Sequence, residues 1–265
     1  MSYYDSISSW VHVKLLIGIE FNEVLSMKKC IHCRWLIPTY ILAIGGLLLT
    51  TVFGSRAITT VSENFPITAR KCVVIDAGHG GEDGGAVSYT GVYESQINLQ
   101  IALRLEDLMH LLGIDTVMIR STDCSVYTKG DTLASKKVSD LKERVRITNA
   151  TENAVLVSIH QNQFAESRYS GAQVFFASTE GSKDLAQTIQ NSFIQTLNPG
   201  SKRQIKKANG IYLMQHIQCT GVLVECGFIS NPEEEAKLRS TEYQQKISCI
   251  LAAACSQFLN GTAKT

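Results

Sequence analysis

The sequence predicts an α/β protein with one globular domain, preceded by an N-terminal membrane segment. Three observations support this prediction. From residue 72 onward, short apolar runs alternate with amphipathic stretches of helical length, a pattern typical of a sheet whose strands are connected by helices on both faces. Polar residues suited to chemistry follow several of the apolar runs. An uncharged apolar stretch before residue 56 is about long enough to cross a bilayer.

The expected strands and helices follow from the spacing of apolar residues. Strand candidates are short and rich in β-branched residues, whereas helix candidates repeat apolar residues with helical spacing. Strands are expected at 72–76, 115–119, 154–159, 172–177 and 221–226. Helices are expected at about 92–112, 139–150, 182–197 and 239–259. The residues between the second strand and the second helix, 121–138, are expected to form a loop.

The uncharged stretch, residues 35–55, is interpreted as a transmembrane or signal segment. Lys28, Lys29 and Arg34 precede it, and few basic residues follow it closely. Basic residues favour the cytoplasmic side of a membrane segment. We therefore expect residues 1–34 in the cytoplasm and the globular domain outside it.

The start of the chain allows two interpretations. Translation from Met27 would give a basic segment that leads directly into an apolar core, the layout of an export signal. The native start is therefore either Met1 or Met27, and the signal is either cleaved or retained as an anchor. Residues 56–71 lack any helical or strand period and contain Pro66, so they are expected to form a linker to a domain over 72–260.

Composition excludes some classes of protein and leaves others open. The chain has 265 residues, 45% of them apolar, and a net charge of +1, which suits one sizeable core. The basic run at Lys202, Arg203, Lys206 and Lys207 is interpreted as a solvated face, and we expect no nucleic-acid partner. Six of the eight cysteines follow the membrane segment, mostly within apolar patterns, where they suit burial; disulfides are neither required nor excluded.

A glycine-rich loop follows the first expected strand and contains His79. The segment reads VVIDAGHGGEDGGAV, residues 73–87. Glycines leave the backbone free to turn and to approach a ligand closely. Neither nucleotide-binding fingerprint fits, because the loop has no Gly-Lys-Ser/Thr ending and lacks the dinucleotide spacing of glycines. On this loop alone, His79 is either a functional residue or a structural one.

Three more polar residues lie where a site is expected. His160 ends the strand VLVSIH, Glu225 ends the strand GVLVEC, and Glu94 begins the helix after the glycine-rich loop. Open α/β sheets build their sites at the carboxyl ends of strands. Each residue also has a structural interpretation, since Glu94 could stabilise a helix N-terminus and His160 could be a hydrogen-bonded core imidazole. Their coincidence with His79 favours a site.

These residue types fit a hydrolytic zinc ion. Zinc takes imidazole nitrogens and carboxylate oxygens as ligands, and catalytic sites commonly have three protein ligands. His79, Glu94 and His160 supply that set. Glu225 remains as a carboxylate that can take a proton from the attacking water and pass it to a leaving amine. The spacing differs from the local H-E-x-x-H helix, so the fold must assemble the site.

Several motifs together resemble a known family. They are the glycine-rich loop with His79, Glu94 at the head of a long helix, RSTD at 120–123, LKERVRITNA, VSIHQN and VLVECGFISNPEE. In this order they are similar to the zinc-dependent N-acetylmuramoyl-L-alanine amidases of the type 3 family. The resemblance covers Cys72 to about Leu259.

The resemblance implies a fold, a site and a substrate. It implies a mostly parallel, roughly six-stranded sheet, a zinc ion held by His79, Glu94 and His160, and Glu225 as the catalytic carboxylate. It also implies cleavage of the amide between N-acetylmuramic acid and L-alanine in peptidoglycan, which agrees with export. Gln161 departs from the family, in which a smaller residue is commoner, and this difference is expected to alter the substrate rim.

The short layout, a membrane segment followed by a bare catalytic domain, is similar to the sporulation amidases. These enzymes trim peptides from spore cortex glycan so that muramic δ-lactam can form. The expected location of this chain is extracytoplasmic, either membrane-anchored or secreted, with the space between the spore membranes as one candidate. We therefore expect peptidoglycan strands as substrate, attachment to the membrane through the N-terminal segment, and an activating or localising protein partner. Two other classes stay open: a zinc carboxypeptidase or other wall peptidase, and a non-catalytic wall-binding protein.

Overall fold

The computed structural model describes residues 70–261 of the chain. The predicted membrane segment at 35–55 lies outside the described residues, and so does most of the linker at 56–71. No helix within 70–261 has the length and apolar character needed to span a membrane. The membrane anchor and the domain boundaries therefore stay predictions.

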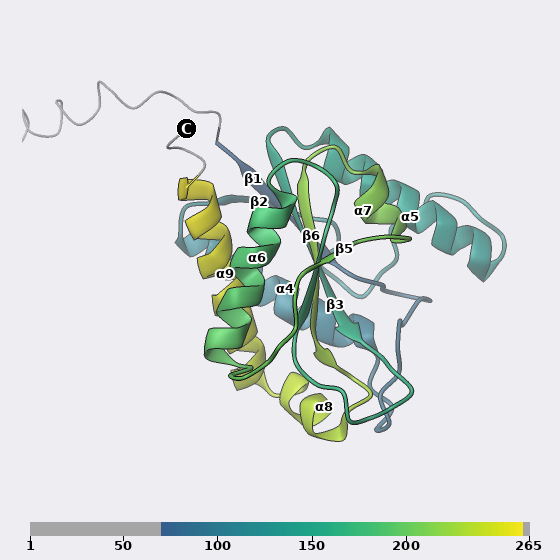
Figure 1. The fold of residues 1–265 in the computed structure, drawn as a ribbon. Helices are drawn as coiled ribbons and strands as arrows, with labels where there is room; N and C mark the ends of the chain where they lie inside the picture. Colours follow the sequence, from purple (N-terminus) through teal and green to yellow (C-terminus); the bar gives the residue numbers. More distant parts are fainter. Residues whose placement is uncertain (1–69, 262–265) are drawn as a thin grey trace, which may run out of the picture. The chain divides into compact units, whose positions relative to one another are not determined.

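The described chain alternates strands and helices (Figure 1). The strands are β1 (Cys72–Ala77), β2 (Asp115–Met118), β3 (Ala154–Asn162), β4 (Gln173–Phe176), β5 (Lys206–Lys207) and β6 (Thr220–Phe228). The helices are α4 (Glu94–Leu111), α5 (Leu133–Ala150), α6 (Ser182–Thr196), α7 (Tyr212–His216), α8 (Pro232–Leu238) and α9 (Thr241–Gly261). All the expected strands and helices are present, and β5, α7 and α8 are additional.

The strands form one six-stranded sheet in the order β2-β1-β3-β6-β4-β5. All neighbouring pairs are parallel except β4 and β6, which are antiparallel. The prediction of a single α/β domain with a mostly parallel sheet is therefore confirmed. Because β1, β3 and β6 are adjacent and parallel, their carboxyl ends meet at one edge of the sheet.

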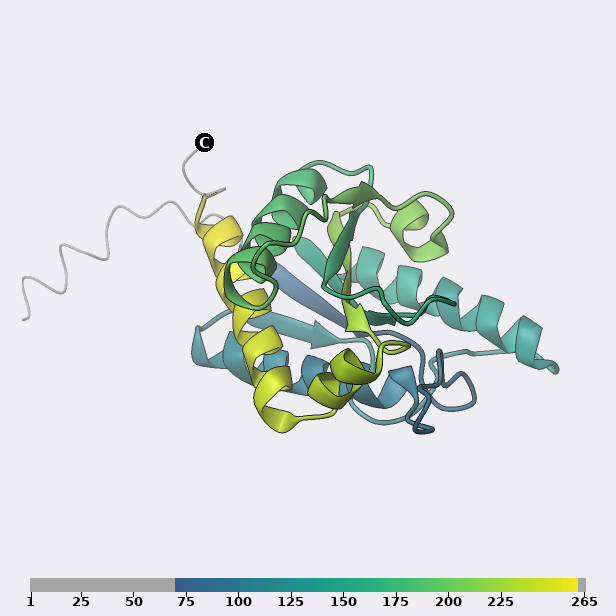
Figure 2. The same ribbon diagram turned by 60° about the horizontal axis from the view of Figure 1, so that its bottom comes forward.

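Helices cover both faces of this sheet (Figure 2). One face packs against α4, α6 and α9, and its core includes Val157 on β3 and Val224 on β6. The other face packs against α5 and α7, and its core includes Leu156 and Leu223. Since successive side chains of a strand point to opposite faces, His160 belongs to the same face as Leu156.

Helix α5 begins earlier than its apolar pattern predicts. The hydroxyl of Thr132 accepts a hydrogen bond from the amide of Ser135, and the hydroxyl of Ser135 accepts one from the amide of Thr132, which together form a capping box. The helix therefore starts at Leu133 rather than 139, and the expected loop over 121–138 is shorter. Most side chains of its first two turns are exposed, which explains why they show no apolar period.

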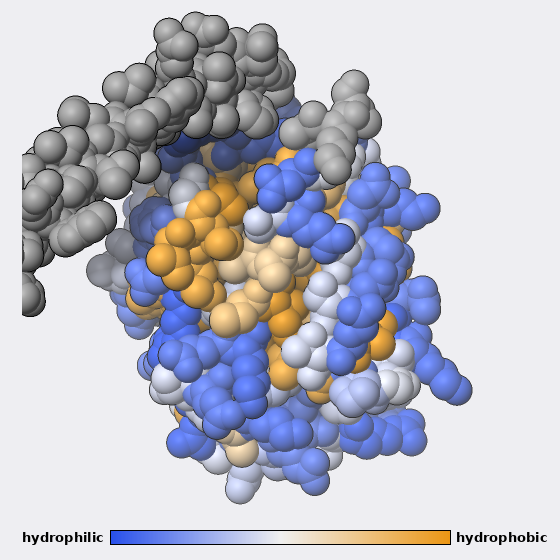
Figure 3. Space-filling view, turned by 90° about the vertical axis from the view of Figure 1, so that its left-hand side faces the viewer, coloured by the Kyte–Doolittle hydropathy of each residue, from blue (hydrophilic) through white to orange (hydrophobic). Residues whose placement is uncertain are grey.

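Some large apolar side chains remain exposed on the surface, among them Leu111 at the end of α4 and Leu133 and Val138 on α5. Figure 3 shows apolar residues gathered on the side of the molecule that carries α6 and α9. A shallow groove between these helices is lined by Cys249, Ile250 and Ala253.

All six cysteines within 70–261 are free thiols.

The capping box should contribute measurably to stability. Replacing Thr132 with alanine leaves the first amides of α5 without a side-chain acceptor, so the free energy of unfolding should fall by about 1 kcal/mol. Urea unfolding of residues 70–261 monitored by circular dichroism measures this loss. Thr188→Ala, which removes a hydroxyl from a partly exposed position of α6, is the control and should change stability by less than Thr132→Ala. Equal effects of the two substitutions would contradict the prediction.

Candidate metal centre

Three predicted site residues converge at the carboxyl edge of the sheet. His79 lies in the loop after β1, Glu94 is the first residue of α4, and His160 lies near the end of β3. Their ligand atoms all lie within 4.8 Å of one another. Nε2 of His79 is 3.3 Å from Oε2 of Glu94, and Nδ1 of His160 is 3.0 Å from Oε1 of the same carboxylate. Two nitrogens and a carboxylate thus face a common point.

Glycines let these side chains approach the backbone. A Cβ atom at Gly78 would lie 2.2 Å from the ring of His160, so the imidazole packs directly on this glycine. Gly85 has φ +71, and a Cβ atom there would lie 2.7 Å from both Oε2 of Glu94 and the ring of His79. The glycine-rich loop therefore serves close packing of the three side chains.

Glu94 is the most constrained member of the group. Its side chain is 5% exposed. Oε2 accepts a hydrogen bond from the amide of Ala86, and Oε1 accepts two, from the amide of Gln161 and from Nδ2 of Asn98. Burial opposes ionisation of this carboxyl, but the hydrogen bonds to His160 and the other imidazole outweigh it and hold the pKa of Glu94 well below its usual range.

Gln161, the residue after His160, is buried rather than exposed at the surface, and its effect on the substrate rim stays a prediction. The residue is 3% exposed, and its Nε2 donates to Oδ1 of Asn98 on α4. Strand β3 continues past His160 to Asn162. The side chain of Gln161 therefore points to the face of the sheet opposite His160, toward Asn98 on α4.

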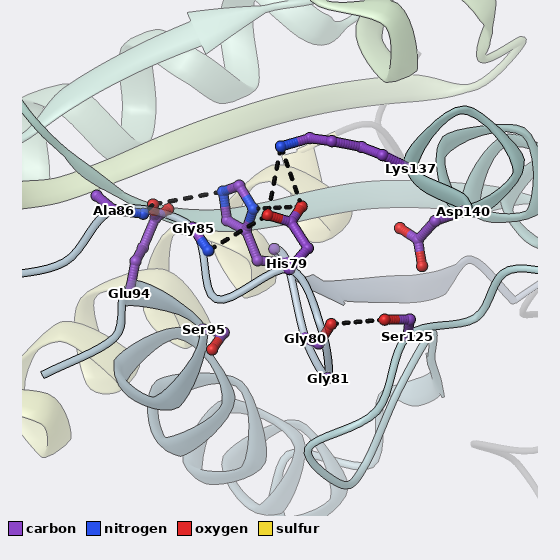
Figure 4. Close-up of polar contacts among 12 residues, drawn as sticks. His79, Gly80, Gly81, Gly85, Ala86, Glu94, Ser95, Ser125, Lys137 and Asp140 are labelled. Carbon is purple, nitrogen blue, oxygen red and sulfur yellow. Dashed lines mark hydrogen bonds and ion pairs between the residues drawn. The ribbon is translucent and has the colours of Figure 1, made fainter. Parts of the chain in front are cut away.

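His79 is held through a carboxylate that the sequence analysis did not single out. Nδ1 of His79 lies 2.9 Å from Oδ2 of Asp83, and the same oxygen lies 3.2 Å from Nζ of Lys137. Figure 4 shows the imidazole of His79 with Glu94 on one side and Lys137 reaching toward its other side. Burial lowers the pKa of His79, but the hydrogen bonds to Asp83 and Glu94 outweigh burial and raise it to about 9. The Glu-Asp pair in the motif GHGGEDGG was the sequence signal that could have identified Asp83.

Glu225 lies beside the three-residue group but is not part of it. It is the register partner of His160 in the β3–β6 ladder. Its Oε2 atom is buried and has no hydrogen-bond partner within the described residues. Burial is the main cause that raises the pKa of Glu225 to about 7. A carboxyl in this state can exchange a proton near neutral pH.

The donor chemistry of the group fits a divalent metal ion. Two imidazole nitrogens and a carboxylate oxygen are the ligands that zinc takes in catalytic sites. The second ring nitrogen of His79 is hydrogen-bonded to the carboxylate of Asp83. Histidines that bind metal ions commonly make such a hydrogen bond with their other ring nitrogen. The fold and the site together define a class: α/β proteins with a candidate metal centre assembled by separate strands and a helix, flanked by a protonatable glutamate.

Comparison with known proteins gives the family. The sequence profile of the N-acetylmuramoyl-L-alanine amidases matches residues 73–257. The chain therefore belongs to the N-acetylmuramoyl-L-alanine amidase family, and the family resemblance seen in its motifs is confirmed. The matched segment contains every residue of the candidate centre.

Individual relatives agree with this assignment. The germination-specific N-acetylmuramoyl-L-alanine amidase of Bacillus subtilis is 34% identical over 180 residues, which cover 67% of this chain and 75% of that protein. The CwlD amidase of Clostridioides difficile, solved in complex with the GerS lipoprotein, aligns with a TM-score of 0.70 at 34% identity, over 72% of this chain and 100% of that chain. An N-acetylmuramoyl-L-alanine amidase of Clostridium difficile 630 aligns with a TM-score of 0.64 at 29% identity, over 73% and 98%.

The close packing of His160 on the loop should make Gly78 intolerant of a side chain. In Gly78→Ala the new methyl group overlaps the imidazole, so the ring or the loop must shift, and the free energy of unfolding should fall by about 1–3 kcal/mol. Denaturant unfolding measures the change. Gly261→Ala, with no atom within 4 Å of the added Cβ, is the control and should be nearly neutral. A neutral Gly78→Ala would show that the contact is looser than described.

Proposed function

We propose that this chain is a zinc-dependent hydrolase that cleaves the amide between N-acetylmuramic acid and L-alanine in peptidoglycan. The observation that carries the proposal is the convergence of His79, Glu94 and His160, with Glu225 as the register partner of His160. The family assignment supplies the scissile bond. The proximity of the four side chains supports a joint role for them.

His79, Glu94 and His160 would hold the metal ion. Each imidazole points one nitrogen at the carboxylate of Glu94. When the rings are neutral, these two nitrogens and the carboxylate oxygens can direct lone pairs at an ion bound among them. When bound, zinc would polarise the substrate carbonyl and make water a stronger nucleophile at neutral pH. The hydrogen bond from His79 to Asp83 would fix the orientation of the ring.

Glu225 would move the proton. Its carboxyl lies on the same face of the sheet as the imidazole of His160, and its Oε2 atom is not engaged by any described side chain. A carboxylate there would take a proton from the attacking water and deliver it to the nitrogen of the leaving L-alanine. A pKa near 7 suits both halves of this transfer.

The spore cortex is the proposed setting. One relative is named for germination, and another was solved with a lipoprotein, which supports action on cortex glycan, leading to muramic δ-lactam, with the help of a protein partner. The uncharged segment at 35–55 would anchor the enzyme or direct it outside the cytoplasm. These assignments support one another, since peptidoglycan lies outside the membrane.

Product analysis separates this proposal from its two rivals. Incubation of the domain and zinc with muramyl peptides should release intact stem peptide and leave free lactyl groups on the glycan, as measured by mass spectrometry. Loss of a single terminal amino acid would indicate a carboxypeptidase instead. Binding of the glycan without any product would indicate a wall-binding protein. A parallel digest of cortex and vegetative wall would show which one the enzyme prefers.

Glu94 and Glu225 should respond differently to the same substitution. Glu225→Gln keeps the volume but cannot carry a proton, so the variant should retain zinc and lose roughly 10²–10⁴-fold in turnover. Glu94→Gln should lose zinc, because an amide is a poorer zinc ligand than a carboxylate. Zinc content and hydrolysis are measured on the same preparations, before and after addition of excess zinc. Added zinc should partly rescue Glu94→Gln only; rescue of Glu225→Gln would reverse the two roles.

Zinc affinity should fall as the pH is lowered through about 9. The pKa of metal-free His79 is raised to about 9, so below that pH a bound metal must displace a proton, and affinity should fall about tenfold per pH unit from this group alone. Competition with a chelator measures the affinity. In Asp83→Asn, loss of the carboxylate lowers the pKa of His79, so the plateau of affinity should begin at a lower pH. An unchanged pH profile in Asp83→Asn would contradict this account.

A further inference from the structure

Two buried arginines converge on the backbone around His79. Arg144, on α5, donates from Nη2 to the carbonyl oxygen of His79 at 2.8 Å and from Nη1 to that of Ala77 at 3.1 Å. Arg120, after β2, donates from Nε to the carbonyl oxygen of Ala77 at 2.7 Å and from Nη2 to that of Gly78 at 3.0 Å. Three consecutive carbonyls at the end of β1 are thus held by guanidinium groups.

The backbone that these groups hold is strained. His79 has φ +62, a left-handed conformation in which its Cβ is crowded. Within residues 70–261 only one other non-glycine residue, Asn153, has a positive φ, and asparagine tolerates that conformation better. Glycine would relieve the strain at 79 but would remove the imidazole. Such conformations persist only where the surroundings enforce them.

Arg144 is itself fixed in place. Its guanidinium pairs with Asp76, and its Nε lies 2.6 Å from Oδ2 of Asp140. Asp76 is in turn held by the hydroxyl of Ser158 at 2.6 Å. The side chain of Arg144 is 3% exposed. Two carboxylates therefore neutralise its charge and orient its fork, so that one nitrogen faces the carbonyl of His79.

We propose that Arg144 is a positioning residue for the metal centre. It holds the main chain of His79 in the left-handed conformation, so that the imidazole already faces Glu94 and His160 before a metal ion arrives. The proposal rests on the function proposed above only for the identity of the metal. Preorganisation of this kind strengthens binding, because the ion need not order its own ligands.

Lysine cannot reproduce these contacts. The planar guanidinium reaches Asp76, Asp140 and the carbonyl of His79 from three nitrogens at once, whereas an ammonium is a single point on a flexible stem. In Arg144→Lys the charge can still pair with one carboxylate. The carbonyl of His79 then loses its donor, although the buried charge is kept.

The test measures the loop and the metal separately in Arg144→Lys, using the full chain. In the metal-free variant, the amides of Gly80 and Gly81, which are hydrogen-bonded in the structure, should exchange with deuterium faster than in the wild type. Zinc affinity, measured by competition with a chelator, should fall roughly 10–100-fold, as for other residues that orient metal ligands. The visible spectrum of the Co²⁺-substituted variant should change, because the ligand geometry changes.

Thr148→Val is the matched control for stability. Thr148 is fully buried on the same helix, and its hydroxyl donates to the main-chain oxygen of Arg144 without touching the loop. This variant should lower the melting temperature yet leave loop exchange, zinc affinity and the Co²⁺ spectrum as in the wild type. If Arg144→Lys binds zinc with wild-type affinity, or if zinc affinity falls equally in both variants, the proposal is overturned.

A second variant, Asp140→Asn, tests the proposal in case Arg144→Lys does not fold. Asp140 is 13% exposed in its side chain, and Asp140→Asn loosens one support of the guanidinium while keeping the helix. Asp140→Asn should show smaller changes of the same kind in loop exchange, zinc affinity and the Co²⁺ spectrum. If Gly80 and Gly81 exchange in this variant as slowly as in the wild type, the proposal is overturned. If the wild-type chain binds no zinc, the proposed function fails, whereas exchange of Gly80 and Gly81 still decides the positioning role.

Discussion

One buried carboxylate, Glu94, ties the candidate centre together. Its two oxygens face both imidazoles and accept hydrogen bonds from the loop after β1, from β3 and from its own helix. An ionised carboxylate is costly to bury unless its lone pairs are satisfied. The start of α4, the glycine-rich loop and the end of β3 must therefore take up their positions together. The positive end of the helix dipole favours the same charge, which agrees with the structural interpretation of Glu94, while its role as a metal ligand stays a proposal.

The parts of the structure that sequence could predict are those with a local signal. The parallel strands carry continuous apolar runs, and the polar residues that end them are brought together because β1, β3 and β6 are neighbours. This geometry unites His79, Glu94 and His160, although their roles stay proposals. Asp83 was within reach too, since it lies four residues from His79 in the same motif.

Other features depend on contacts that no local pattern shows. Arg144 belongs to an amphipathic, charged stretch that resembles a surface helix, and its burial arises from Asp76, which lies 68 residues away in the sequence. Strand β5 contains only two lysines, which have no apolar signal. The start of α5 is set by a cap at Thr132 rather than by apolar spacing. The burial of Gln161 depends on the continuation of β3 beyond His160, which the apolar pattern of the sequence did not show.

Strand β5 has a consequence for how molecules of this protein meet one another. The sheet is open, and β5 is its outermost strand on the side of β4. Lys206 and Lys207 are both exposed there, as their interpretation as part of a solvated face required. A short, positively charged border offers few free backbone groups and repels a second copy, which discourages strand-to-strand stacking. At high local concentration, a protein with such an edge would thereby be protected from sheet-to-sheet association.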